Sequence, residues 1–256
     1  MTTSANVPRE CTDSNNRNTN CGCFFVYLKK FSTFAYSKKL VLIDMDVRET
    51  RNSRLGATMV KNLERRHFEA HYCPTRLEAI ELIDTLIADG SSVSWGGSMT
   101  IRDMGLIDHL RHRQSLLLLD REALTDREEI EALYRETFGC DVFLTSANAI
   151  SEEGVLVNID GNGNRVAAIT WGPKRVIHVV GLNKVAQDVD AAIKRARSTA
   201  APINATRFGI QTPCQTDGRC HNCNSPQCIC NYIHLLRNNN GANRHVVVLV
   251  GEELGY

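Results

Sequence analysis

The sequence predicts an α/β fold built around parallel strands. Segments with strand character alternate with helical patterns of roughly 10–15 residues, and parallel strands need crossover connections of this kind. The chain has 256 residues, of which 43% are hydrophobic. That length can bury the core of one α/β domain, because such folds commonly reach ~200–250 residues before they divide.

The elements follow in order after Asp46. Leu55, Met59 and Leu63 share one face of a helix, and Thr75 with Glu78 forms a capping-box pattern that predicts the start of a second helix. Further helices are expected over 100–113, 126–138 and 185–198, and strands over 68–73, 91–97, 115–120, 141–148, 175–181 and 245–256. No internal repeat is visible.

The pattern changes between the fourth and fifth of these strands. The segments GVLVNID and RVAAITWG flank the turn formed by Asp160, Gly161, Asn162 and Gly163. Because glycines supply the positive φ angles that tight turns require, we expect a β-hairpin there.

Composition excludes several classes of function and divides the chain. Lys and Arg number 30 against 29 Asp and Glu, so no basic excess indicates a nucleic-acid partner. No apolar stretch approaches the ~18 residues of a membrane span. Residues 1–44 are polar and rich in Asn, Ser and Thr, and we expect a poorly ordered extension before a domain over 45–256.

Ten cysteines are the unusual feature of the composition, and five of them lie in one segment, 213–231. Without a signal peptide a reducing cytoplasm is expected, where clustered thiols more often hold metal than form disulfides. Soft sulfur ligands suit both tetrahedral zinc and iron–sulfur clusters. Redox-active or purely structural thiols remain alternatives. The five are Cys214, Cys220, Cys223, Cys228 and Cys230.

Two other segments have residues suited to binding an anion. Gly96, Gly97, Ser98 and Thr100 lie between a predicted strand and a helix, where backbone N–H groups favour phosphate or carboxylate, although a tight turn needs the same residues. Lys184 follows a strand and is expected either in the same strand-end crevice or on the surface.

The second of these segments is the run from 145 to 165. Glu152 is a candidate general acid, base or nucleophile, while Asp160, Asn164 and Arg165 are candidates to orient an anionic substrate. The alternative is that these residues form only a turn and a solvated surface.

These strings together resemble the LUD-domain, or lactate-utilisation, family over about residues 46–256. SVSWGGSMTIRDMGL, VVGLNK, APINATR, TPCQTDGRCHNCNSP and VVVLVGEELGY occur in the order that the family shows. The resemblance implies a sugar-isomerase/CoA-transferase-like open sheet with flanking helices and a C-terminal cysteine-rich metal loop. It also implies a role in oxidising L-lactate to pyruvate within an iron–sulfur-dependent system.

Site residues carry over from the family position by position. The glycine loop matches at Gly96, Gly97, Ser98 and Thr100, and the second loop matches at Glu152, Gly154, Asn158, Asp160, Gly161, Asn164 and Arg165. The cysteine segment matches at Cys214, Cys220, Cys223 and Cys230, the implied ligands of an iron–sulfur cluster, with [4Fe–4S] favoured and zinc as the alternative. Cys228 departs from the family pattern.

The resemblance also implies partners. A cluster that carries single electrons cannot take the hydride of lactate, so an iron–sulfur or flavin partner subunit is expected. The ligand is expected to be a small carboxylate or a phosphate-bearing metabolite. A non-redox isomerase or acyl-transfer enzyme, with Glu152 as base or nucleophile, and a metabolite-binding protein, each with a structural zinc, remain alternatives.

Overall fold

The computed structural model describes residues 47–240 and 243–256, and the predicted extension over 1–44 lies outside these ranges. Contacts define a compact unit over Glu49–Tyr256, to which the following description applies. Within the described ranges, every helix is too short or too polar to cross a membrane.

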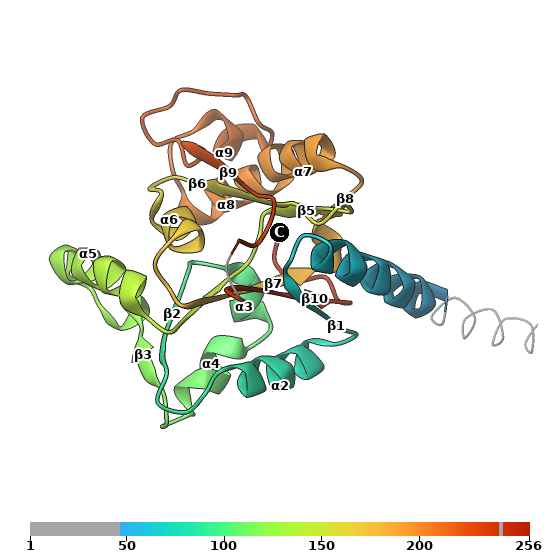
Figure 1. Ribbon diagram of the computed structural model, residues 1–256. Coiled ribbons are helices and arrows are strands. Elements are labelled where there is room, and N and C mark those ends of the chain that lie inside the picture. The colour runs from blue at the N-terminus through green and yellow to red at the C-terminus, as the bar shows by residue number, and fades with distance from the viewer. Residues whose placement is uncertain (1–46, 241–242) are drawn as a thin grey trace, which may run out of the picture. The chain divides into compact units, whose positions relative to one another are not determined.

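A six-stranded sheet, called sheet A here, forms the centre of the unit (Figure 1). All of its strand pairs are parallel, which confirms the predicted fold class. The strand order is β1 (Glu69–Cys73), β10 (His245–Val250), β7 (Arg175–Gly181), β4 (Val142–Thr145), β2 (Ser92–Trp95) and β3 (Leu117–Leu119).

Three helices cover one face of sheet A, namely α2 (Arg76–Leu86), α3 (Met99–Asp103) and α4 (Leu106–Arg111). Their apolar side chains form one cluster with Val93, Leu144 and Val248 of the sheet. The predicted start of α2 is confirmed, because the Thr75 hydroxyl accepts a hydrogen bond from the Glu78 backbone N–H. The single helix expected over 100–113 divides at Gly105, whose φ of 83° ends one helix and begins the next.

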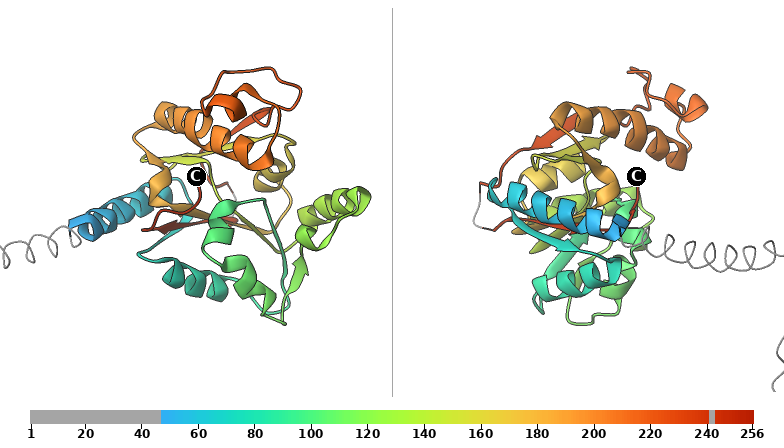
Figure 2. Two further views of the ribbon diagram at one scale, coloured as in Figure 1. Left: turned by 180° about the vertical axis from the view of Figure 1, so that it is seen from behind. Right: turned by 90° about the vertical axis from the view of Figure 1, so that its right-hand side faces the viewer.

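A second sheet, called sheet B here, covers much of the other face (Figures 1 and 2). Its strand order is β8 (Val185–Ala186), β5 (Ala149–Ser151), β6 (Leu156–Asp160) and β9 (Tyr232–Leu236). Leu156 of sheet B and Leu249 of sheet A belong to one buried cluster, which the helix ending at residue 64 completes with Met59 and Leu63. The sequence patterns predicted β6 but neither β8 nor β9.

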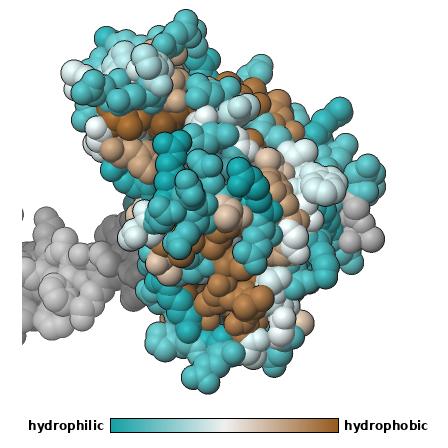
Figure 3. Space-filling model, turned by 90° about the vertical axis from the view of Figure 1, so that its left-hand side faces the viewer, coloured by the Kyte–Doolittle hydropathy of each residue, from teal (hydrophilic) through white to brown (hydrophobic). Residues whose placement is uncertain are grey.

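Helices close the outer face of sheet B. α7 (Val189–Arg195), a π-helical turn (Ala196–Ala200) and α8 (Ala201–Phe208) follow one another and pack small side chains on the sheet. The cysteine segment comes next, beginning in α9 (Pro213–Asp217) and leading into β9. The remaining helix, α5 (Arg127–Glu136), lies between β3 and β4 in the chain. Figure 3 shows one face of the surface, where hydrophobic areas are interrupted by hydrophilic side chains.

The predicted hairpin after β6 is wrong, because the chain enters a helix, α6 (Asn164–Thr170). The Asp160 carboxylate accepts hydrogen bonds from the backbone N–H groups of Asn162, Gly163 and Val166, at 3.1–3.2 Å. These are N–H groups at a helix start, which lack partners within the helix. Gly163 has a φ of 83°, so its freedom serves the entry into α6 rather than a two-strand turn.

Two histidines are buried between the sheets. His178 of β7 and His245 of β10 lie 3.1 Å apart, from Nε2 of His178 to Nδ1 of His245. Burial lowers the pKa of His178 well below its usual value, and burial together with the charge of Arg244 lowers the pKa of His245 to about 4. Both imidazoles are therefore neutral in the folded protein at neutral pH.

We predict that acid destabilises the fold through these two side chains. In the unfolded chain a histidine binds a proton near pH 6.5, whereas folded His245 does so only near pH 4. The contribution of this side chain to the free energy of unfolding is therefore fully present above about pH 6.5 and is lost as the pH falls towards 4. His245 alone accounts for about 3 kcal/mol. Urea unfolding midpoints across this pH range measure the effect. His245→Gln should flatten the dependence, and the exposed control His112→Gln should not.

Candidate functional site

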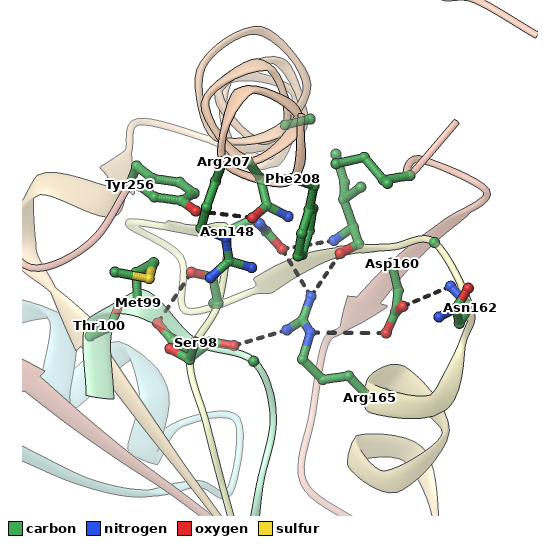
Figure 4. A pocket seen from close by; sticks show the side chains of 18 of the residues that line it. Ser98, Met99, Thr100, Asn148, Asp160, Asn162, Arg165, Arg207, Phe208 and Tyr256 are labelled. Atoms are coloured by element: carbon green, nitrogen blue, oxygen red, sulfur yellow. Dashed lines mark hydrogen bonds and ion pairs between the residues drawn. The ribbon is translucent and has the colours of Figure 1, made fainter. Parts of the chain in front are cut away.

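A cavity of about 300 Å³ lies beyond the carboxyl ends of three sheet A strands (Figure 4). β2, β4 and β7 each lead into a loop that lines it, and α8 and the C-terminal Tyr256 close the opposite side. Carboxyl ends of parallel strands are where ligands of open α/β sheets bind. The cavity is therefore the candidate site.

The structure brings most of the predicted crevice residues together. Those that line the cavity are Gly97, Ser98, Thr100, Asp160, Gly161, Asn164, Arg165 and Lys184. Gly96 lines a small adjoining cavity instead, and a Cβ there would lie 3.0 Å from Cδ of Arg165. Asn158 is fully buried behind the wall and reaches the site only through Arg165.

Arg165 is the hub of the cavity wall. Its two terminal nitrogens donate to four oxygens from two segments, the loop after β4 and strand β6, at 2.8–3.1 Å, and its Nε lies 3.9 Å from the Asp160 carboxylate. The four acceptors are the carbonyls of Ser146 and Ile159 and the amide oxygens of Asn148 and Asn158. A guanidinium has five N–H donors, so the protein uses nearly all of them. Arg165 supplies positive charge and position, but few free donors.

Lys184 lies in a similar environment. It is 3% exposed, and its Nζ is within 3.2 Å of the Thr100 hydroxyl, the Ser146 hydroxyl and the Ala147 carbonyl. Burial, with smaller contributions from Arg195 and Arg165, lowers the pKa of Lys184 to about 7. The amine therefore titrates near neutral pH.

Two arginines that the sequence analysis missed have free donors. Arg121 donates from Nη1 to the Tyr134 hydroxyl at 2.6 Å, and a Cβ on Gly97 would lie 2.8 Å from its Nη2. Arg207 of α8 stacks over Phe208 at 4.4 Å and has no hydrogen-bond partner among the described residues. Arg121 comes directly after a predicted strand and could have been found by that position, whereas no sequence signal marks Arg207.

The charge of the cavity lining favours anions. Four cationic side chains line it, namely Arg121, Arg165, Lys184 and Arg207, whereas Asp160 is the only acidic side chain among the described lining residues. Asp160 already accepts hydrogen bonds from the start of α6. Figure 4 shows Arg207 and Phe208 reaching in from the α8 side and Arg165 from the opposite side.

Glu152 lies away from this cavity. It lines a different, open depression together with Arg66 and Gln187, and its backbone carbonyl accepts a hydrogen bond from the Asn62 amide. A carboxylate in that position cannot act on a ligand held among the arginines. The predicted role of Glu152 as acid, base or nucleophile therefore has no geometric support in this cavity.

The cysteine segment reaches the cavity through Ile229, but none of its five cysteines lines the cavity. Its five thiols are unpaired, and in 47–240 and 243–256 no three Cys, His, Asp or Glu side chains converge closely enough to hold a metal. Burial, followed by the charges of Cys228, Cys220 and Cys214, raises the pKa of Cys230 to about 12. These four thiols are therefore neighbours, and Cys223, which belongs to the predicted ligand set, is absent from that group. The donors suit a soft metal by their chemistry but not by their present arrangement.

Comparisons with known proteins identify a family and two solved structures to which this chain is similar. A family model described as the LUD domain matches residues 57–250. A DUF162 family protein from Deinococcus radiodurans is 15% identical, with a TM-score of 0.46 over 78% of this chain and 98% of that chain. Ribose 5-phosphate isomerase from Plasmodium falciparum is 12% identical, with a TM-score of 0.29 over 44% and 52%. A search of curated proteins gave no match.

Removing the Arg165 guanidinium should destabilise the protein far more than removing a guanidinium that has no hydrogen-bond partner among the described residues. We predict that Arg165→Met lowers the free energy of unfolding by about 3–5 kcal/mol, because buried oxygens lose their donors. The matched control Arg207→Met should change it by less than about 0.5 kcal/mol. Urea denaturation followed by circular dichroism measures both. Equal effects would contradict the structural role assigned to Arg165.

Proposed function

Because this chain belongs to the LUD-domain family, which is associated with lactate utilisation, we propose that its crevice binds a small carboxylate such as L-lactate or pyruvate. One observation carries the proposal. Arg121 and Arg207 present guanidinium donors to a cavity whose only described acidic side chain, Asp160, is already hydrogen-bonded. Guanidinium groups match the geometry of a carboxylate.

In the proposed binding mode, one cationic side chain hydrogen-bonds the ligand directly and two others contribute only positive charge. Arg121 donates to the ligand carboxylate from the nitrogens that Tyr134 leaves free, with the Ser98 hydroxyl as an additional partner, since that hydroxyl has none among the described residues. Arg165 and Lys184 add positive charge without being displaced from their protein acceptors. The wall is thus set before the ligand arrives, which reduces the cost of ordering it.

Oxidation of lactate to pyruvate removes a hydride from carbon and a proton from the hydroxyl. Among the described lining residues, Lys184 has a pKa near 7 and suits the proton transfer. No described lining side chain can accept a hydride. We therefore include in the proposal a partner subunit with a flavin that accepts the hydride, from which an iron–sulfur system can carry the two electrons onward one at a time.

We also propose that the cysteine segment holds an iron–sulfur cluster, with [4Fe–4S] favoured over zinc. The support is the gathering of soft donors, since three further thiols neighbour Cys230. Cys214, Cys220, Cys223 and Cys230 would hold the group, and it would supply electron transfer when bound. Because the thiols do not converge as they are placed, we route no reaction step through this segment.

A second candidate function is a metabolite-binding protein with a structural zinc. The position of Glu152 outside the cavity favours it over an isomerase or acyl-transfer enzyme, which would need a catalytic carboxylate beside the ligand. Binding without turnover in the presence of redox partners would select this alternative.

Arg121→Met should weaken binding of lactate and pyruvate about 10- to 100-fold, since a hydrogen bond to a charged group is worth ~1.5–3 kcal/mol. Isothermal titration calorimetry measures it. The control Arg127→Met removes a guanidinium that is 91% exposed on α5 and outside the cavity, and it should leave affinity unchanged. Binding of sugar phosphates but of neither acid would contradict the carboxylate proposal.

Protein purified without oxygen should be brown and contain iron and acid-labile sulfide. Cys220→Ser and Cys223→Ser should each abolish the visible absorbance, whereas the matched control Cys228→Ser should retain it. Colourless protein with about one zinc per chain would support the second candidate. Loss of metal in Cys228→Ser alone would show that Cys228 replaces Cys223 as a ligand.

A further inference from the structure

A group of polar side chains lies between the two sheets, apart from the crevice. Alternate residues of a strand face the same side, and the neighbours of His178 and His245 along their strands, such as Val180 and Val247, pack towards sheet B. Asn158 of β6 shares its face with Leu156, which packs towards sheet A. Both His178 and Asn158 are 0% exposed.

Three nitrogens in this region have no hydrogen-bond partner among the described residues. They are Nδ1 of His178, Nδ2 of Asn158 and Nδ1 of His234. Asn158 and His234 are directly opposite each other in the β6–β9 pairing, so their side chains share one face. His234 and Arg165, which holds Asn158, also lie close enough to His178 to affect its pKa. Buried polar atoms in folded proteins are almost always paired, so each of the three needs a partner that the described side chains do not supply.

The surrounding hydrogen bonds fix which of these nitrogens carry hydrogen. Arg244 can only donate, so Nε2 of His245 accepts from it at 2.8 Å and the hydrogen of His245 is on Nδ1. That Nδ1–H donates to Nε2 of His178 at 3.1 Å. The hydrogen of neutral His178 is therefore on its Nδ1, and this atom is a donor without an acceptor.

The other two nitrogens follow by the same reasoning. The Asn158 amide oxygen accepts from Arg165 at 2.8 Å, which orients its NH₂ group as a donor. The Thr170 hydroxyl gives its hydrogen to the Val166 carbonyl at 2.7 Å, so it accepts from Nε2 of His234 at 3.2 Å. Nδ1 of His234 is then an acceptor with a free lone pair.

We propose that these three side chains form a binding site for one buried water molecule that joins the two sheets. The water oxygen accepts from His178 and Asn158, and one of its hydrogens is donated to His234. A buried water typically makes about three hydrogen bonds, and two donors with one acceptor match a water molecule.

The number of donors and acceptors at the site distinguishes water from other ligands. A metal ion needs lone pairs, but His178 and Asn158 present N–H groups. An anion would accept from both donors yet could not donate to His234. The water site is also connected to the crevice wall. The Asn158 amide oxygen accepts a hydrogen bond from Arg165, and its NH₂ group donates one to the water. The water thereby holds the amide that positions the crevice wall from behind.

Two measurements on the full wild-type chain test the proposal. Long-range ¹H–¹⁵N NMR at about pH 7.5 should find hydrogen on Nδ1 of His178 and His245 and on Nε2 of His234. A high-resolution crystal structure should show one oxygen about 2.7–3.2 Å from all three unpaired nitrogens. Hydrogen on Nε2 of His178, a peak at the ~2.0–2.1 Å of a zinc ligand, or no density would each overturn it.

A variant tests the acceptor. In wild-type protein a water–protein cross-relaxation signal is expected at the His178 Nδ1–H, as from a long-lived internal water. His234→Phe keeps a ring but removes the acceptor, and this signal should be lost while the His178 tautomer is kept. The exposed control His112→Phe should retain the signal. Retention in His234→Phe would overturn the assignment of His234.

Discussion

The candidate site depends on a single buried guanidinium. Arg165 is at the start of α6, yet its nitrogens hold the loop after β4 and two positions of β6 at 2.8–3.1 Å. A charge in such a place is costly unless every donor is used, and here the surrounding oxygens use them. The same residue favours glycine at 96, because a Cβ there would lie 3.0 Å from its Cδ, a tight contact. The glycine loop, the β4 loop and sheet B are therefore positioned by one side chain.

This arrangement gives the cavity two classes of positive charge. Arg165 and Lys184 are occupied by protein oxygens, and burial lowers the pKa of both. Arg121, beside Gly97, and Arg207, on α8, have donors to spare. Charges that are already held in place raise the positive potential of the cavity, and no free energy is spent on reorganising them when an anion binds. The cavity therefore favours an anion before any ligand is present.

The space between the sheets has a polar centre within an apolar layer. Leu236 packs against the buried clusters on both sides of it, while His178, His245 and Asn158 lie in the middle. His245 pairs with His178 within sheet A, and the Asn158 amide oxygen accepts from Arg165 on the side of sheet B. The proposed water would complete a hydrogen-bond network that joins the two sheets. The cysteine segment lies outside this network, and its thiols have hydrogen bonds only within their own loop.

Local patterns in the sequence determined the strand–helix alternation, the cap at Thr75 and the placement of Lys184 after a strand, because each depends on neighbouring residues. Sequence could not decide the role of the turn at 160–163, since the same glycines serve a hairpin or a helix entry, and the Asp160 carboxylate selected the helix. It also could not separate Glu152 from the cavity or bring Arg121 and Arg207 into it. Those placements come from contacts between distant parts of the chain, which only the packing of two sheets and their helices establishes.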